Sequence, residues 1–467
     1  MKPSQKLLLL FLFVTIACNA FAPQRLLMPS KTITAMQVIT HPDGPLYAGD
    51  RVSFEVLAPS GFQTDGKQVR ISLPGKSLGD EKFAPFGMGQ RNEATFFWVW
   101  DTSELQPGDY VLTFSILPGT ASWDEKFTLR NPAELPASQR TAAWKSTSSG
   151  CCELHYISDT DSEKDLESLK SMADAQASDV ERRMGVNFTA KIPITFLPRT
   201  LGHGGFTSNG IYLSYLRNNY AGSTTAQVMH HEMVHWLDGQ LGGKLRPSML
   251  QEGLAVYLSD GHFKVEPILP RAAALLDLGW YVPLRKLADS FYLSQHEVGY
   301  AEAAALVSYM VKTFGWDDFN AFYRAILPVA GGSETAALDA ALLEHYHINL
   351  DQLEKDFIHF LRQQSFDENI RTDLKLTVSF YDTVRRYQVE MDPSAYFLYA
   401  WLPDIPEMRQ RGIVADLLRH PVSFYGMQIE RLLVACDADL RAGNYGAAGN
   451  NIRAVNMILN IVNFPGE

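Results

Sequence analysis

The hydrophobic pattern changes its period along the chain, and this change constrains the fold more than any other feature. From about residue 36 to 130, short runs such as RVSFEVLAP and ATFFWVWDT alternate apolar and polar residues between Pro, Gly and Asp. This alternation predicts an antiparallel β-sandwich. Beyond Gly261 the apolar residues recur at helical spacing, as in PRAAALLDL and AEAAALVSYMVKTFG. Because 467 residues are too many for one core, we expect several domains of different class.

These patterns divide the chain into a leader, two structured parts joined by a linker, and a helical end. The piece DTSELQPGDYVLTFSI resembles the late hairpin of bacterial immunoglobulin-like domains, which usually serve as spacers or binding modules. The next part mixes strands such as IPITFLP with helices, which predicts an α+β domain. The expected boundaries are 1–22 for the leader, 23–132 for the immunoglobulin-like β-sandwich, 133–150 for the linker, 151–365 for the α+β domain and 366–467 for the α-helical C-terminal region.

The composition is that of a folded, acidic protein. Hydrophobic residues make up 46% of the chain and charged residues 20%, so we expect it to fold throughout. A formal net charge of -11, with no long Lys/Arg cluster to offset it, argues against electrostatic binding of nucleic acid.

The first residues, MKPSQKLLLLFLFVTIACNAFAPQ, have the pattern of a signal peptide. Two lysines precede an apolar run from Leu7 to Ala17, which is too short to cross a bilayer. TIAC resembles a bacterial lipobox ending at Cys18, although its threonine replaces the usual aliphatic residue, and a cut after Ala20 or Ala22 is the alternative. We therefore expect an exported protein, secreted or lipid-anchored to the cell envelope of a bacterium.

The other cysteines provide no disulfide framework and no paired metal site. Cys151 and Cys152 are adjacent, and neighbouring cysteines cannot easily bond to each other across a trans peptide. A bridge from one of them to Cys436 is one expectation, and buried or unpaired thiols are the other.

The stretch QVMHHEMVHWLDGQ contains H-E-x-x-H as His231, Glu232 and His235. Residues four apart lie on one face of an α-helix, so the two histidines can present their imidazole nitrogens to one metal ion. Glu232 lies at the edge of that face, within reach of a water molecule at the metal. Because five letters can match by chance, the assignment of a zinc site depends on a third ligand.

The sequence after this motif excludes one class of zinc enzyme and offers that ligand. A metzincin would have Gly and His where this chain has Asp238 and Leu241. Further on, RPSMLQEGLAVYLSDG predicts a second helix capped by Ser248, with Glu252 in its first turns. If the two helices pack together, this carboxylate points at the imidazoles, and Gly253 allows the close approach.

With these residues the chain resembles the gluzincin metallopeptidases, specifically the peptidase MA-like family. The resemblance rests on HExxH followed by Glu252 within EGLAVY, and it implies a thermolysin-like fold for 151–365. The ligands that it implies for Zn2+ are His231, His235 and Glu252. It also implies that Glu232 is the general base, which accepts a proton from the attacking water. The spacing from His235 to Glu252 is slightly shorter than in thermolysin-like gluzincins, which leaves the arrangement of the connecting loop open.

The resemblance further implies a donor that stabilises the oxyanion of the transition state. In related gluzincins a Tyr or His from the later helical part is this donor. Tyr300 is our candidate, and His296 is the second choice. The alternative for Tyr300 is an ordinary packing role. The segment LGHGGFTSNGIYLSY is expected to supply the edge strand along which gluzincins align the substrate backbone. Asp238 either accepts a hydrogen bond from a ligand imidazole or marks the end of the helix.

The sequence therefore predicts an exported zinc metallopeptidase acting on a peptide or protein substrate. No clear G-x-M-E-N-like segment is found, which favours an endopeptidase over an aminopeptidase. The alternative is a binding or scaffold protein of the cell envelope that kept the fold, with the β-sandwich as its working part. Glu232 favours the enzyme, because a scaffold does not need a general base.

Overall fold

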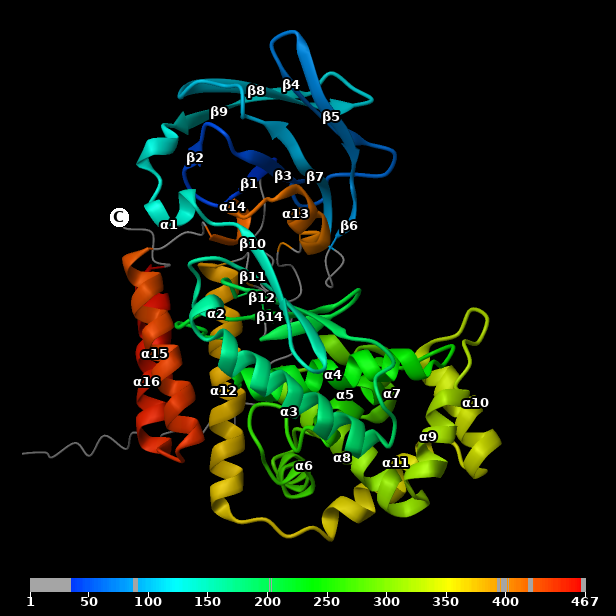
Figure 1. Cartoon of the computed structure of the whole chain (residues 1–467). Coiled ribbons are helices and arrows are strands. Elements are labelled where there is room, and N and C mark those ends of the chain that lie inside the picture. The colour runs from blue at the N-terminus through cyan, green and yellow to red at the C-terminus, as the bar shows by residue number, and fades with distance from the viewer. Residues whose placement is uncertain are drawn as a thin grey trace, which may run out of the picture.

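The computed structural model describes residues 35–86, 91–200, 202, 204–392, 395, 401, 403–418 and 423–462. The expected leader and the expected lipid site at Cys18 lie outside these residues. The described chain combines strand-rich sheets at one end of the molecule with a helical body and a helical C-terminal region, as predicted (Figure 1). Of the described helices, none is both long enough and apolar enough to span a membrane.

The N-terminal strands form two sheets around one core. They are β1 (Gln37–His41), β2 (Leu46–Tyr47), β3 (Arg51–Leu57), β4 (Gln68–Leu73), β5 (Lys76–Lys82), β6 (Ala84–Phe86), β7 (Arg91–Asp101), β8 (Gly108–Leu117) and β9 (Ser122–Arg130). Within the described residues, one sheet has the order β1-β3-β7-β6 and the other β2-β9-β8-β4-β5. Phe54 and Phe96 from the first sheet and Phe114 from the second meet in a shared core. The immunoglobulin-like character of this part remains a prediction.

A mixed sheet follows and supports the helices. Within the described residues its order is β10-β11-β12-β14-β13, with bounds Trp144–Ser148, Cys152–Ile157, Ile192–Leu197, Ile211–Ser214 and Gly205–Thr207 in that order. β11, β12 and β14 are parallel, whereas β10 and β13 pair antiparallel at the two edges. The stretch 133–150, expected as a linker, thus contributes β10, because WKSTS pairs residue by residue with β11.

The two faces of the mixed sheet pack against different parts of the chain. On β12, Ile194 and Phe196 join the core of the helical body, whereas Leu197 joins a cluster on the opposite face. This separation follows from the two-residue period of a strand. The sheet therefore connects the helical body to the elements beyond it.

The helical body contains the site, and its central helix is almost wholly buried. Its elements are α2 (Asp161–Lys164), α3 (Leu166–Met184), α4 (Thr225–Leu241), α5 (Ser248–Leu258), α6 (Ile268–Asp277), α7 (Leu284–Asp289), η2 (Phe291–Leu293), α8 (His296–Phe314), α9 (Trp316–Ala325), α10 (Glu334–Tyr346) and α11 (Leu350–Arg362). Two short helices, η1 (Pro132–Glu134) and α1 (Ala137–Arg140), lie outside it, between β9 and β10. Every residue of α8 from His296 to Met310 is buried. This helix is therefore the core helix that its apolar sequence predicts.

The C-terminal region is helical, as predicted, and packs against the rest of the molecule. It contains α12 (Glu368–Glu390), α13 (Ile405–Arg411), α14 (Ala415–Leu418), α15 (Phe424–Arg441) and α16 (Tyr445–Val462). α15 and α16 form a helix pair that turns at Gly443, where φ is 73°, a conformation that glycine adopts readily. Figure 1 shows α12 running along the helical body, with α15 and α16 beside it and α13 and α14 next to the N-terminal sheets. The C-terminal region thus contacts both ends of the molecule.

The expectation that adjacent cysteines would not bond to each other is wrong. Cys151 and Cys152 form a disulfide, with their Cα atoms 3.8 Å apart. Asp174 accepts hydrogen bonds from the backbone N–H groups of Gly150 and Cys151 and so holds this turn. Cys436 is a free thiol buried in the core that α15 and α16 share with α12, so the expected bridge to it does not form.

Candidate metal centre

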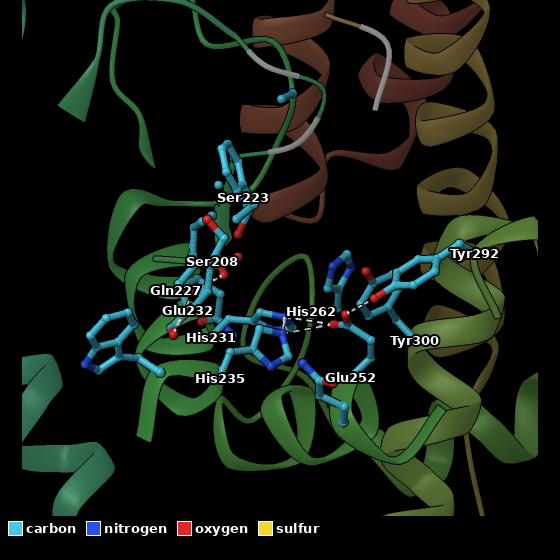
Figure 2. A pocket seen from close by; sticks show the side chains of 18 of the residues that line it. Ser208, Ser223, Gln227, His231, Glu232, His235, Glu252, His262, Tyr292 and Tyr300 are labelled. Atoms are coloured by element: carbon cyan, nitrogen blue, oxygen red, sulfur yellow. Dashed lines mark hydrogen bonds and ion pairs between the residues drawn. The ribbon is translucent and has the colours of Figure 1, made fainter. Parts of the chain in front are cut away.

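Helices α4 and α5 bring the three predicted metal ligands together. His231 and His235 lie one turn apart on α4, and Glu252 lies on α5 (Figure 2). The Nε2 atoms of the two histidines are 2.9 Å apart. Glu252 Oε2 is 3.1 Å from His231 Nε2 and 3.2 Å from His235 Nε2. Three potential ligand atoms therefore converge on one point.

The arrangement of these atoms fits a zinc ion. Two imidazoles and one carboxylate form a common donor set of catalytic zinc sites, with bonds of about 2.0–2.2 Å. In a tetrahedral site, bonds of that length separate the ligand atoms by roughly 3.3–3.6 Å. The separations of 2.9–3.2 Å are slightly shorter, so a small outward shift of the side chains would admit the ion.

Burial and mutual charge set the protonation of these side chains. Burial lowers the pKa of His231 to about 4, so this imidazole is neutral at pH 7. Although burial opposes it, the neighbouring imidazoles hold the pKa of Glu252 well below its usual value. Against the effect of burial, the charge of Glu252 raises the pKa of His235 to about 9. The buried carboxylate is thus matched by positive charge at this point, which a metal ion can supply in place of the proton on His235.

Glu232 lies beside the converging side chains and is held by the edge strand. Its Oε2 accepts a hydrogen bond of 2.7 Å from Thr207 Oγ1, on β13. The residue is 6% exposed, and burial raises the pKa of its carboxyl group to about 7, although His235 and Thr207 oppose this shift. In Figure 2, Glu232 lies to one side of the three ligand side chains, and Tyr292 and Tyr300 lie to the other.

Tyr300, the predicted oxyanion donor, lies close to the ligands. It is 6% exposed and lines the same cavity as His231. Its ring stacks on His262 with the centroids 4.0 Å apart, and its centroid is 6.2 Å from that of His231. His296, the second choice, packs against His262 and Tyr300 but is not among the described residues that line the cavity.

Two further groups at the site were missed by sequence reasoning. The hydroxyl of Tyr292 donates a hydrogen bond of 2.6 Å to Glu252 Oε1, the carboxylate oxygen that does not face the histidines. His262 lies in the turn after α5, and its Nδ1 is 2.6 Å from Glu297 Oε1. Neither residue belongs to a sequence motif that includes HExxH. Only the folding of the loops brings the two side chains to the site. Thr207, by contrast, lies in the segment that was expected to form the edge strand.

The three predicted ligand side chains line a cavity of about 810 Å³, to which several elements contribute. Gly205 to Thr207 of β13 form part of one wall, and β13 is the edge strand of the mixed sheet within the described residues. Tyr381 of α12 also lines the cavity, so the C-terminal region takes part in the site. An extended segment of another chain could pair with the free side of such a strand.

Local details of the two ligand helices differ from the expectations. α5 begins at Ser248 itself, whose backbone N–H donates to Glu334 Oε2, and Pro247 occupies the N-cap position. Gly253 allows a close approach to α8 rather than to α4, because a Cβ atom there would lie 2.5 Å from the carbonyl oxygen of Ala303. α4 continues three residues beyond Asp238, to Leu241, so Asp238 does not mark its end.

Asp238 does not contact a ligand imidazole either. Among the described residues, His235 Nδ1 is buried without a hydrogen-bond partner. The Asp238 carboxylate instead accepts a hydrogen bond from Tyr323 and pairs with Arg246 and Arg324. Its expected role in orienting the metal ligands is therefore replaced by contacts with the loop after α4 and with α9.

No protein-family model matches the chain, and no curated protein matches it either. Among solved structures, the chain is similar to a crystal structure of an M1 zinc metallopeptidase mutant from Deinococcus radiodurans, with 12% sequence identity and a TM-score of 0.34. The match covers 72% of this chain and 95% of the other. A likeness of this size carries no argument about activity.

Proposed function

We propose that this chain is a zinc-dependent metallopeptidase of the gluzincin type that hydrolyses peptide bonds in exported or extracellular peptides or proteins. One observation carries the proposal: His231 Nε2, His235 Nε2 and Glu252 Oε2 lie 2.9–3.2 Å from one another beside a cavity that Glu232 also lines. The carboxyl group of Glu232 supports catalysis rather than mere metal storage, since a storage site does not need a general base.

In this proposal His231, His235 and Glu252 hold the zinc ion. When bound, zinc supplies Lewis acidity, which polarises a substrate carbonyl and lowers the pKa of a water molecule. Glu232 accepts a proton from the attacking water at Oε1, the oxygen to which Thr207 does not donate. It then passes this proton to the leaving amine. Thr207 keeps the carboxylate of Glu232 in one orientation during both transfers.

The remaining walls of the cavity bind and orient the substrate. The edge of β13 can pair with an extended peptide, which would place a backbone carbonyl near the ligand cluster. Tyr300 is our proposed donor to the oxyanion, because its side chain lines the cavity next to His231. His262 stacks on the Tyr300 ring and lines the same cavity, so it would hold the tyrosine in place.

The proposal is tested with Glu232→Gln, which keeps the shape of the side chain and removes its basicity. Purified wild-type and variant proteins are loaded with zinc, incubated with a diverse peptide mixture and compared by mass spectrometry. We expect cleavage by the wild type, a loss of several orders of magnitude in the variant, and equal zinc content in both. Full activity of Glu232→Gln would refute the assigned role.

The same experiment separates the enzyme from the alternative function. If neither protein cuts any peptide while both hold zinc, a binding or scaffold role for the cell envelope is supported instead. Cuts inside peptides rather than at their ends would identify an endopeptidase. Export through the leader at 1–22, with or without a lipid at Cys18, is part of the proposal and is checked by the N-terminus of the mature protein.

A further inference from the structure

A buried aspartate close to the site is paired with two arginines. Asp238, about one turn beyond His235 on α4, is 1% exposed. Its Oδ1 is 2.5 Å from Arg324 Nη2, and its Oδ2 accepts hydrogen bonds of 3.1 Å from both Arg246 Nη1 and the hydroxyl of Tyr323. One negative charge is therefore shared by two positive charges.

Arg324 is the structural partner of this aspartate. It also donates to the backbone carbonyls of Asp238 and Gly242, and its guanidinium lies 4.9 Å from the centroid of the Tyr323 ring. These contacts use its donors within the protein and join α9 to the end of α4. The charge of Asp238 is thus already neutralised without Arg246.

Arg246 has a different environment. It lies in the connection between α4 and α5, its side chain is 31% exposed, and it lines the same cavity as His231 and Glu252. Within the described part of the chain, its one polar contact is with Asp238, through Nη1. Nε and Nη2 remain for another partner, and a guanidinium with two free donors matches a carboxylate in a bidentate geometry.

The charge of the cavity makes this partner an anion. Arg246 carries the positive charge that Asp238 does not compensate. The acidic side chains of the cavity lining have other partners: Thr207 donates to Glu232, and Tyr292 and the histidines contact Glu252. Resting on the proposed peptidase function, we propose that Arg246 binds a carboxylate of the peptide substrate. The carboxylate belongs either to an acidic side chain near the cleaved bond or to the C-terminus of the substrate.

The test uses a set of four peptides for each position of one cleavable sequence, with Glu or Gln at that position and with a free or amidated C-terminus. We expect the wild type to prefer a carboxylate at one position, and Arg246→Gln to reduce that preference in kcat/KM by roughly tenfold to a hundredfold. If Glu peptides are still cleaved faster than Gln peptides when the C-terminus is amidated, the carboxylate belongs to an acidic side chain. If amidation itself removes the preference, the carboxylate is the C-terminus of the substrate. Arg246→Lys keeps the charge but loses the planar pair of donors of the guanidinium, so it should retain part of the preference.

The matched control is Lys244→Gln, which removes an exposed positive charge from the same loop. It should leave the preference unchanged, because Lys244 is outside the described lining of the cavity. Arg246→Gln should still fold, since Asp238 keeps Arg324 and Tyr323. Equal preferences in Arg246→Gln and the wild type would overturn the inference and leave Arg246 as a loop anchor.

A binding measurement distinguishes this inference from the proposed function. Fluorescence anisotropy of a labelled Glu peptide and its Gln counterpart is measured on the Glu232→Gln variant, with and without Arg246→Gln. Tighter binding of the Glu peptide that depends on Arg246 supports the inference even if no peptide is cleaved by the wild type. Cleavage by the wild type without any dependence on Arg246 would support the peptidase and refute the subsite.

Discussion

At the scale of single residues, the proposed zinc site depends on a side chain that holds one of the proposed ligands. Tyr292 donates to the Oε1 atom of Glu252, which leaves Oε2 facing His231 and His235. Removing such a support usually weakens metal binding because the ligand can rotate. We therefore expect Tyr292→Phe to lower zinc affinity by about 10–100-fold, measured by competition with a chelator.

A second tyrosine provides the matched control for this prediction. The hydroxyl of Tyr281 donates to Glu354 Oε1, a contact that involves no metal ligand. Tyr281→Phe should therefore bind zinc as the wild type does. Equal zinc affinities for Tyr292→Phe and Tyr281→Phe would show that Tyr292 does not support the site.

At the scale of elements, the contact of α5 with α8 sets the position of Glu252. A Cβ atom at Gly253 would lie 2.5 Å from the carbonyl oxygen and 2.7 Å from the carbonyl carbon of Ala303, both backbone atoms of the buried helix. Because backbone cannot rotate away, Gly253→Ala must push the two helices apart. We expect it to lower the free energy of unfolding by about 3 kcal/mol, measured by urea denaturation.

Another helical glycine shows whether the effect comes from packing. Gly446 lies in α16 with nothing within 4 Å of the position of its Cβ. Gly446→Ala should therefore be neutral or stabilise the protein by up to about 1 kcal/mol, through its better helix propensity. If both substitutions shift the urea midpoint equally, close packing of α5 on α8 is not the cause.

At the scale of the whole molecule, α14 joins the N-terminal sheets to the segment after β12 through Asp416. Asp416 Oδ2 accepts a hydrogen bond of 3.2 Å from Trp98 Nε1, and Arg199 donates to the backbone carbonyl of Asp416. Burial raises the pKa of Asp416 from 3.8 to about 7, with Arg199 acting against this shift and Asp43 and Asp50 adding to it.

The sign of the resulting pH dependence follows from this raised pKa. The neutral carboxyl favours the folded state fully below the unfolded pKa near 4, and the advantage is lost as pH rises towards 7. We expect Asp416→Asn, which stays neutral, to reduce the decline of Tm between pH 5 and 7. The exposed Asp317→Asn should keep the wild-type profile. Parallel Tm profiles for Asp416→Asn and the wild type would contradict this role.

Sequence reasoning reached the parts of the site that are encoded by local spacing. His231 and His235 share a helical face because they are four residues apart, and Glu252 follows on a short second helix. Tyr292 and His262 could not be found in this way, because their positions depend on how the turns after α5 and before α8 fold. The partner of Gly253 was misjudged for the same reason: the sequence indicates a close approach but not which helix makes it.

The division between sequence and tertiary structure follows from the range of the forces involved. The hydrophobic periods, the signal-like leader and the HExxH spacing are local, so the sequence by itself determined the order of strand-rich and helical parts and the predicted metal chemistry. The bond between neighbouring Cys151 and Cys152 forms in a turn that Asp174 holds from α3. The contact of Tyr292 with Glu252 and the placement of Arg246 in the cavity were decided by how segments separated in the sequence pack together. Such contacts depend on packing and burial in three dimensions, which no spacing along the chain records.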